Sequence, residues 1–106
     1  MDHSLEDIEK KLAEVPEDLR QAITSVDTAA ALQNIAKMHQ LHIDQMDELF
    51  DETGLVMLGL THPTKFIANI ATRLNLPREK ATEIGKDVNE RIFRPVRESL
   101  KRLHRL

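Results

Sequence analysis

Apolar residues recur every three or four positions along almost the whole chain, and this spacing constrains the fold more than any other feature. Positions three and four apart lie on one face of an α-helix, so the spacing predicts amphipathic helices. No segment alternates between apolar and polar residues for long enough to predict a strand. The sequence therefore predicts an all-α fold. Its clearest apolar stripe follows Pro63 and comprises Phe66, Ile67, Ile70, Ala71 and Leu74.

Capping residues and prolines divide this pattern into six or seven short helices. A Ser, Thr or Asp side chain can cap the free N–H groups of a first turn, and Pro suits a helix start because its nitrogen carries no hydrogen. Inside a helix Pro95 would remove a hydrogen bond, so we expect it to begin the last helix. The expected start signals are Ser4, Pro16, Ser25 or Asp27, Pro63, Pro77 and Pro95.

The remaining boundaries follow from turn residues and glycines. We expect the first helix to end near Val15 and a turn to lie near His39 to His42. The fourth helix is expected to continue through Gly54, at a cost of about 1 kcal/mol relative to Ala, and to end near Gly59. The 106 residues include three Phe and no Tyr or Trp. They predict one domain, a compact bundle with a mainly aliphatic core.

The chain also contains an apparent internal repeat. A shift of 35 residues aligns the tripeptide Asn-Ile-Ala at 34–36 with the same tripeptide at 69–71. Repeats of this length are typical of helical hairpins, so units 26–60 and 61–95 would form two pseudo-repeated hairpins in one bundle. Any two amphipathic helix pairs with turns of equal length would align in the same way, so a chance similarity remains an alternative.

Charge is divided unevenly between the two halves of the chain, whose net charge is −3. Residues 1–60 carry 4 Lys or Arg and 13 Asp or Glu, whereas residues 61–106 carry 11 and 5. Such asymmetry indicates an interacting surface. We expect the acidic and basic halves to complement one another, either inside one fold or between two copies. A basic segment that seeks a phosphate-rich partner is the alternative.

That alternative would use residues 66–93 as a helix-turn-helix for nucleic acid, with Asn75 in the turn. The second helix of this unit also carries Glu79, Glu83 and Asp87, whose carboxylates repel phosphate. A plain helical hairpin is therefore the main interpretation, and nucleic-acid binding through the hairpin and the basic C-terminal helix is the runner-up. The candidate interaction residues in either case are Arg78, Lys80, Lys86, Arg91, Arg94, Arg97, Lys101 and Arg102.

Signals for a metal site or a catalytic site are weak. His39 and His42 lie close to Asp44 and Asp47, and imidazole with carboxylate suits zinc. The two histidines flank a predicted turn, however, so we interpret them as solvated turn residues. With no Cys and only three Gly, the chain offers no thiolate and no glycine-rich phosphate loop. We expect a non-catalytic domain that needs no cofactor or metal.

Three segments in the later part of the chain are distinctive, namely HIDQ at 42–45, GLVMLGLTHP at 54–63 and NERIFRPVRESL at 89–100. They resemble small uncharacterised helical proteins of bacteria, to which no activity is attached. The resemblance covers roughly residues 25–104 and implies a bacterial, cytoplasmic, all-helical domain. It transfers no functional residue to this chain.

Taken together, these features favour a protein-interaction or self-association domain. The candidate contacts are the apolar run Leu55 to Leu58, although apolar runs usually pack inside, and the basic side with Arg91, Arg94, Arg97 and Arg102. The polar, acidic N-terminus lacks the layout of a signal peptide, and no apolar run is long enough to span a bilayer. We therefore expect a cytoplasmic protein with a protein partner, or itself, as ligand and with no membrane contact.

Overall fold

In the computed structural model, which describes residues 4–105, the first and third helices begin at serines that the sequence predicts as caps. The hydroxyl of Ser4 accepts a hydrogen bond from the N–H of Asp7, and that of Ser25 accepts one from the N–H of Asp27, both at 3.1 Å. Ser25 is therefore the cap of the third helix. The α-helices are α1 (Leu5–Glu14), α2 (Glu17–Thr24), α3 (Val26–Met38), α4 (Ile43–Met57), α5 (Phe66–Arg73), α6 (Arg78–Val88) and α7 (Arg97–His104).

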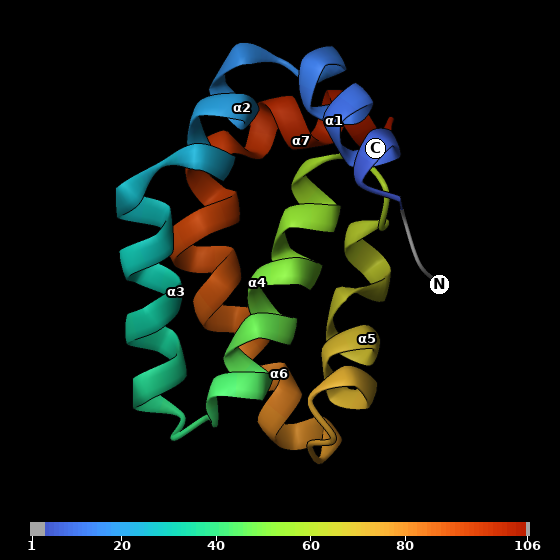
Figure 1. Cartoon of the computed structure of the whole chain (residues 1–106). Helices are drawn as coiled ribbons and strands as arrows, with labels where there is room; N and C mark the ends of the chain where they lie inside the picture. Colours follow the sequence, from blue (N-terminus) through green and yellow to red (C-terminus); the bar gives the residue numbers. More distant parts are fainter. Residues whose placement is uncertain (1–3, 106) are drawn as a thin grey trace.

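The body of the bundle is formed by α3, α4, α5 and α6, which stand side by side, and one end of it is covered by α1, α2 and α7 (Figure 1). α5 packs on α4 and α6, while α3 packs on α4 and α6. α1, α2 and α7 cross the end at which α4 terminates. Residues 4–105 contain no strand, which confirms the predicted all-α bundle. No helix in the described part of the chain combines the length and the apolarity that crossing a bilayer requires.

The core is aliphatic, as the composition predicts. Its largest fully buried side chains include Leu19, Leu49 and Ile84, which come from α2, α4 and α6. Phe66 and Phe93 add the one aromatic contact between phenylalanines in residues 4–105, with ring centroids 5.3 Å apart and planes at 75°. Edge-to-face packing of this kind is favourable because the ring edge is positive and the face negative.

Two of the turns have the same geometry at the predicted spacing of 35 residues. Gln40 and Asn75 both adopt the left-handed conformation, with φ of 56° and 55°. This conformation commonly ends a helix, and Gly59 adopts it after α4 with φ of 80°. Because the geometry is common, the duplication into units 26–60 and 61–95 remains a prediction. The matching hydrogen bonds are Leu41 N–H to Ala36 C=O and Leu76 N–H to Ala71 C=O, both 2.9 Å.

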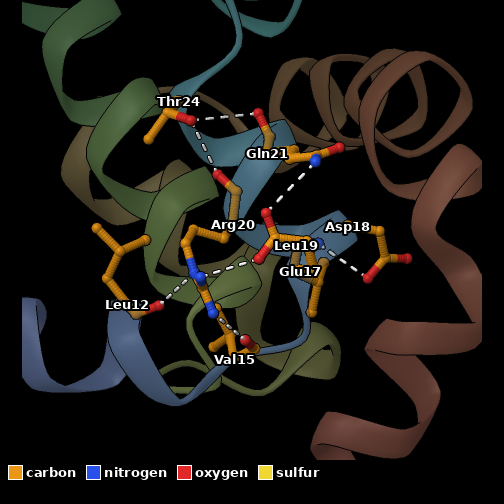
Figure 2. Close-up of polar contacts among 8 residues, drawn as sticks. All are labelled: Leu12, Val15, Glu17, Asp18, Leu19, Arg20, Gln21 and Thr24. Carbon is orange, nitrogen blue, oxygen red and sulfur yellow. Dashed lines mark hydrogen bonds and ion pairs between the residues drawn. The ribbon is translucent and has the colours of Figure 1, made fainter.

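The guanidinium of Arg20 attaches the end of α1 to α2 (Figure 2). Its Nε–H donates to the carbonyl of Leu12 at 3.2 Å and its Nη2–H to the carbonyl of Val15 at 3.3 Å. Carbonyls at a helix C-terminus have no partner within the helix, so Arg20 acts as their cap. The beginning of α1 is held less firmly. None of the α1 residues is buried, and Leu5 is 71% exposed.

Helices α5 and α6 approach each other closely at Gly85. A Cβ atom placed on Gly85 would lie 2.7 Å from Cγ1 of Ile67, which is closer than such atoms approach in proteins. A Cβ on Gly54, which lies inside α4 as predicted, would meet no atom within 4 Å. The crossing of α5 and α6 therefore requires the glycine at 85, whereas α4 has room for a side chain at 54.

We predict that Gly54→Ala raises the free energy of unfolding by about 0.5–1 kcal/mol, because alanine is the better helix former. Gly85→Ala gains the same propensity but must displace Ile67, and overpacking costs about 1–3 kcal/mol. Its free energy of unfolding should therefore fall by about 1 kcal/mol. Urea titrations followed by circular dichroism measure both variants. Equal effects of the two substitutions would contradict the close approach at Gly85.

Candidate functional site

The chain remains helical through Pro95, although the sequence predicts that a new helix begins there. A π turn, η2 (Asn89–Phe93), and a 3₁₀ turn, η3 (Arg94–Val96), connect α6 to α7. In an α-helix the proline ring would clash with the carbonyl four residues earlier. After the wider π turn, the next N–H bonds to a carbonyl five residues earlier. The last helix therefore begins at Arg97, and the expected start at Pro95 is wrong by two residues.

This junction forms one side of a groove of about 440 Å³. The other side is the end of α4 and a short 3₁₀ helix, η1 (Pro63–Lys65). The apolar lining residues are mostly buried, so they form a floor and not an exposed patch. We call this feature the basic groove. It is lined by the apolar Val56, Pro63, Phe93 and Leu100 and by the polar Asn89, Glu90, Arg94, Arg97 and Lys101.

The rim of the basic groove carries excess positive charge. Arg94 pairs with Glu90 at 3.2 Å, and both side chains are about two-thirds exposed. An exposed pair of this kind contributes little to stability. Among residues 4–105, neither Arg97 nor Lys101 forms an ion pair within 4.0 Å. Unneutralised charge beside an apolar floor is complementary to a ligand that is both acidic and apolar.

The structure brings together three of the eight predicted interaction residues and separates the others. Arg78 and Lys80 lie at the start of α6, at the end of the bundle away from α7 (Figure 1). Arg91 donates to Oδ1 of Asn34 on α3 at 2.7 Å. The remaining two also lie outside the lining of the basic groove. They are Lys86, which is exposed on α6, and Arg102, which donates to Oγ of Ser99 at 3.3 Å.

Other parts of the groove were not expected from the sequence. Val56 and Phe93 come from segments far apart in the chain, and only the fold shows that they share a floor. The run Leu55 to Leu58, offered as a contact surface, is largely unavailable to a partner. Val56, Met57 and Leu58 are 0%, 1% and 5% exposed, so this part of the run belongs to the core.

Among the Lys and Arg side chains of residues 4–105, one arginine forms ion pairs between the acidic and basic halves. Arg73 on α5 donates to Glu48 at 2.5 Å and to Asp51 at 2.7 Å, and its Nη1 lies 3.6 Å from Glu52 Oε2. Partial burial lowers the pKa of Arg73, but the hydrogen bonds to Asp51 and Glu48 and the charges of Glu48 and Glu52 raise it above its ordinary value. The guanidinium therefore remains charged while it contacts all three carboxylates.

Histidines at the predicted α3–α4 turn do not converge. His39 lies 2.6 Å from Oδ2 of Asp87 on α6, and its side chain is only 10% exposed. The interpretation of His39 as a solvated turn residue is therefore wrong, while His42 is exposed at the start of α4. His62 contacts Oγ1 of Thr64 at 2.9 Å. In the described residues, no group of three or more His, Asp or Glu side chains has a geometry that could hold a metal ion.

Comparisons with known proteins give no family for this chain. No family model matches it. Neither a curated protein nor a solved structure matches it either. The resemblance to small helical proteins of bacteria therefore remains a prediction, and the function must be inferred from the charges and cavities of this molecule.

We predict that Arg73→Met lowers the free energy of unfolding by about 2–3 kcal/mol. The substitution leaves three carboxylates together and removes the cation nearest to Glu52, whose side chain is 3% exposed. Arg73→Lys should lower the free energy of unfolding by less, because lysine keeps the positive charge. It should still lower it, because lysine lacks the planar guanidinium fork. Urea unfolding measures both variants.

Arg78→Met is the matched control for this prediction. It makes the same change in net charge at an exposed residue that forms no ion pair within residues 4–105, so its effect should stay within about 0.5 kcal/mol. Equal losses for Arg73→Met and Arg78→Met would show that the contacts of Arg73 do not stabilise the fold.

Proposed function

We propose that this chain is a non-catalytic protein-interaction domain that binds an acidic, amphipathic segment in the basic groove. The observation that carries the proposal is the pair of unneutralised charges, Arg97 and Lys101, beside a concave apolar floor. Acidic side chains of a partner would meet the rim, while its apolar side chains would cover Phe93 and Leu100. Charge complementarity of this kind gives an interface its specificity and a high association rate.

A second copy of this chain can supply such a segment in α1. The first two turns of α1 carry Glu6, Asp7 and Glu9 on exposed positions. Leu5 is 71% exposed, so an apolar side chain is also available, whereas Ile8 packs against the core of its own chain. None of the α1 residues is buried within its own chain. Docking of α1 on the basic groove of another copy would pair the acidic and basic halves between chains.

The layout of the charges supports a protein partner over nucleic acid. The basic residues of α6 are interspersed with the exposed carboxylates Glu79 and Glu83. Arg78 and Lys80 are separated from Arg97 by most of the helical run, roughly 25–30 Å at 1.5 Å per residue. Phosphate binding favours a continuous basic stripe, which the carboxylates of α6 interrupt. Surfaces that bind single-stranded nucleic acid also expose aromatic side chains for base stacking.

We predict that light scattering over a concentration series detects a dimer that weakens as salt is added, because salt screens exposed charges. The double variant Arg97→Glu/Lys101→Glu should weaken the dimer by roughly tenfold or more, since it places like charges opposite α1. Arg78→Glu/Lys80→Glu changes the net charge equally outside the groove and should leave the dimer intact.

A charge exchange identifies the docking segment. Glu6→Lys/Glu9→Lys should also weaken the dimer, and mixing this variant with Arg97→Glu/Lys101→Glu should restore association. A wild-type chain that is monomeric at every concentration contradicts self-association. Salt-dependent binding of duplex DNA that is lost in Arg78→Glu/Lys80→Glu, but kept in Arg97→Glu/Lys101→Glu, would instead support the helix-turn-helix alternative.

A further inference from the structure

A second cavity, separate from the basic groove, lies between α4, η1 and α5. Its volume is about 630 Å³, which is within the range of small-molecule sites. We call it the polar pocket. Leu55 and Leu60 form an apolar wall, and both are half-buried. Glu52, Lys65 and Asn69 are among the polar residues that line the rest.

Glu52 has one carboxylate oxygen without a hydrogen-bond donor. Its Oε1 accepts from Nδ2 of Asn69 at 3.0 Å. Its Oε2 is buried and accepts no hydrogen bond from any residue in the range 4–105. Arg73 Nη1 lies 3.6 Å from this oxygen, too far for a hydrogen bond. The residue is only 2% exposed. A buried carboxylate oxygen without a donor is costly, so this atom is suited to accept a donor from a ligand.

The charge around Glu52 indicates which donor the pocket favours. Glu48, Asp51 and Glu52 surround the single guanidinium of Arg73. Three carboxylates around one cation leave a local excess of two negative charges. A neutral donor would satisfy the hydrogen bond, but a cation would also offset this excess. The inner end of the pocket is therefore complementary to an ammonium group.

The other end of the pocket carries the opposite charge. Lys65 is exposed and forms no ion pair among the described residues. Lys65 lies four residues, or about one helical turn, before Asn69, whose side-chain amide donates to Glu52. A ligand that reaches from Glu52 to Lys65 would pass the apolar wall of Leu55 and Leu60.

We infer that the polar pocket binds a small aliphatic zwitterion, with its ammonium group on Oε2 of Glu52 and its carboxylate on Lys65. This inference does not depend on the proposed interaction function, because the pocket shares no lining residue with the basic groove. Free amino acids and ω-amino acids both have this chemistry. The distance between their charged groups distinguishes them.

Isothermal titration calorimetry and NMR titration of the full chain test the inference. The probes are 6-aminohexanoate and L-leucine as zwitterions, and hexylamine and hexanoate as compounds with one charged end each. At least one zwitterion should bind, shift the amide signals of Glu52, Lys65 and Asn69, and bind roughly tenfold or more tightly than either single-ended compound. Preference between the two zwitterions assigns the ligand to the ω-amino or the α-amino class.

Two variants test the two ends separately. Glu52→Gln keeps the size of the side chain but removes its charge, and it should reduce binding of the zwitterion and of hexylamine by tenfold or more. Lys65→Ala should reduce binding of the zwitterion but not of hexylamine, and it changes only an exposed side chain. Glu83→Gln, an exposed carboxylate on α6, is the matched control and should bind like the wild type.

The inference is overturned if neither zwitterion shifts the signals of the pocket. It is also overturned if Glu52→Gln binds as tightly as the wild type, which would leave Glu52 with a purely structural role. If Glu52→Gln does not fold, Lys65→Ala and the four probes still decide the result. Failure of this experiment leaves dimerisation through the basic groove unaffected, and a monomeric chain leaves the pocket unaffected.

Discussion

The contact between Arg73 and three carboxylates of α4 joins the basic half of the molecule to the acidic half. Of the basic residues after position 60, Arg73 is the one that forms ion pairs with the acidic first half in residues 4–105. Its fork matches carboxylates at Glu48 and Asp51, and its charge offsets that of buried Glu52. Because one guanidinium cannot neutralise three carboxylates, α4 retains negative charge. On α7, Arg97 and Lys101 form no ion pair within residues 4–105, so their positive charge is not neutralised there.

Most of the fold could be predicted because helix boundaries depend on local chemistry. Ser4 and Ser25 cap helices through hydrogen bonds that span two or three residues, and Gly59 ends α4 by a local backbone conformation. Pro95 was predicted wrongly because its effect depends on the width of the preceding turn. A π turn needs hydrogen bonds over five residues, and the apolar spacing of the sequence does not distinguish it from an α-helix.

The candidate sites were harder to predict because they depend on contacts between distant segments. Eight basic residues were expected to interact, but only the bend at η3 selects Arg94, Arg97 and Lys101 as one group. The sequence does carry a signal for the second site. Glu52 lies three residues after Leu49 and four before Val56, on the apolar stripe of α4. A carboxylate at such a position is buried by the fold, and its burial is costly unless a donor from the protein or from a ligand pairs with it. The position of Glu52 on this stripe therefore indicates a polar site.

The basic groove and the polar pocket share no lining residue, but the segment from the end of α4 to the start of η1 contributes residues to both. At the end of α4, Val56 lines the groove and its neighbour Leu55 lines the pocket. In the same way, Pro63 lines the groove and its neighbour His62 lines the pocket. α7 holds this segment in place, because Nε2–H of His104 donates to the carbonyl of Val56 at 2.8 Å and its ring packs edge-on against His62. A shift of the segment between α4 and α5 would therefore change the shape of both cavities, so α7 stabilises the pocket as well as forming the groove.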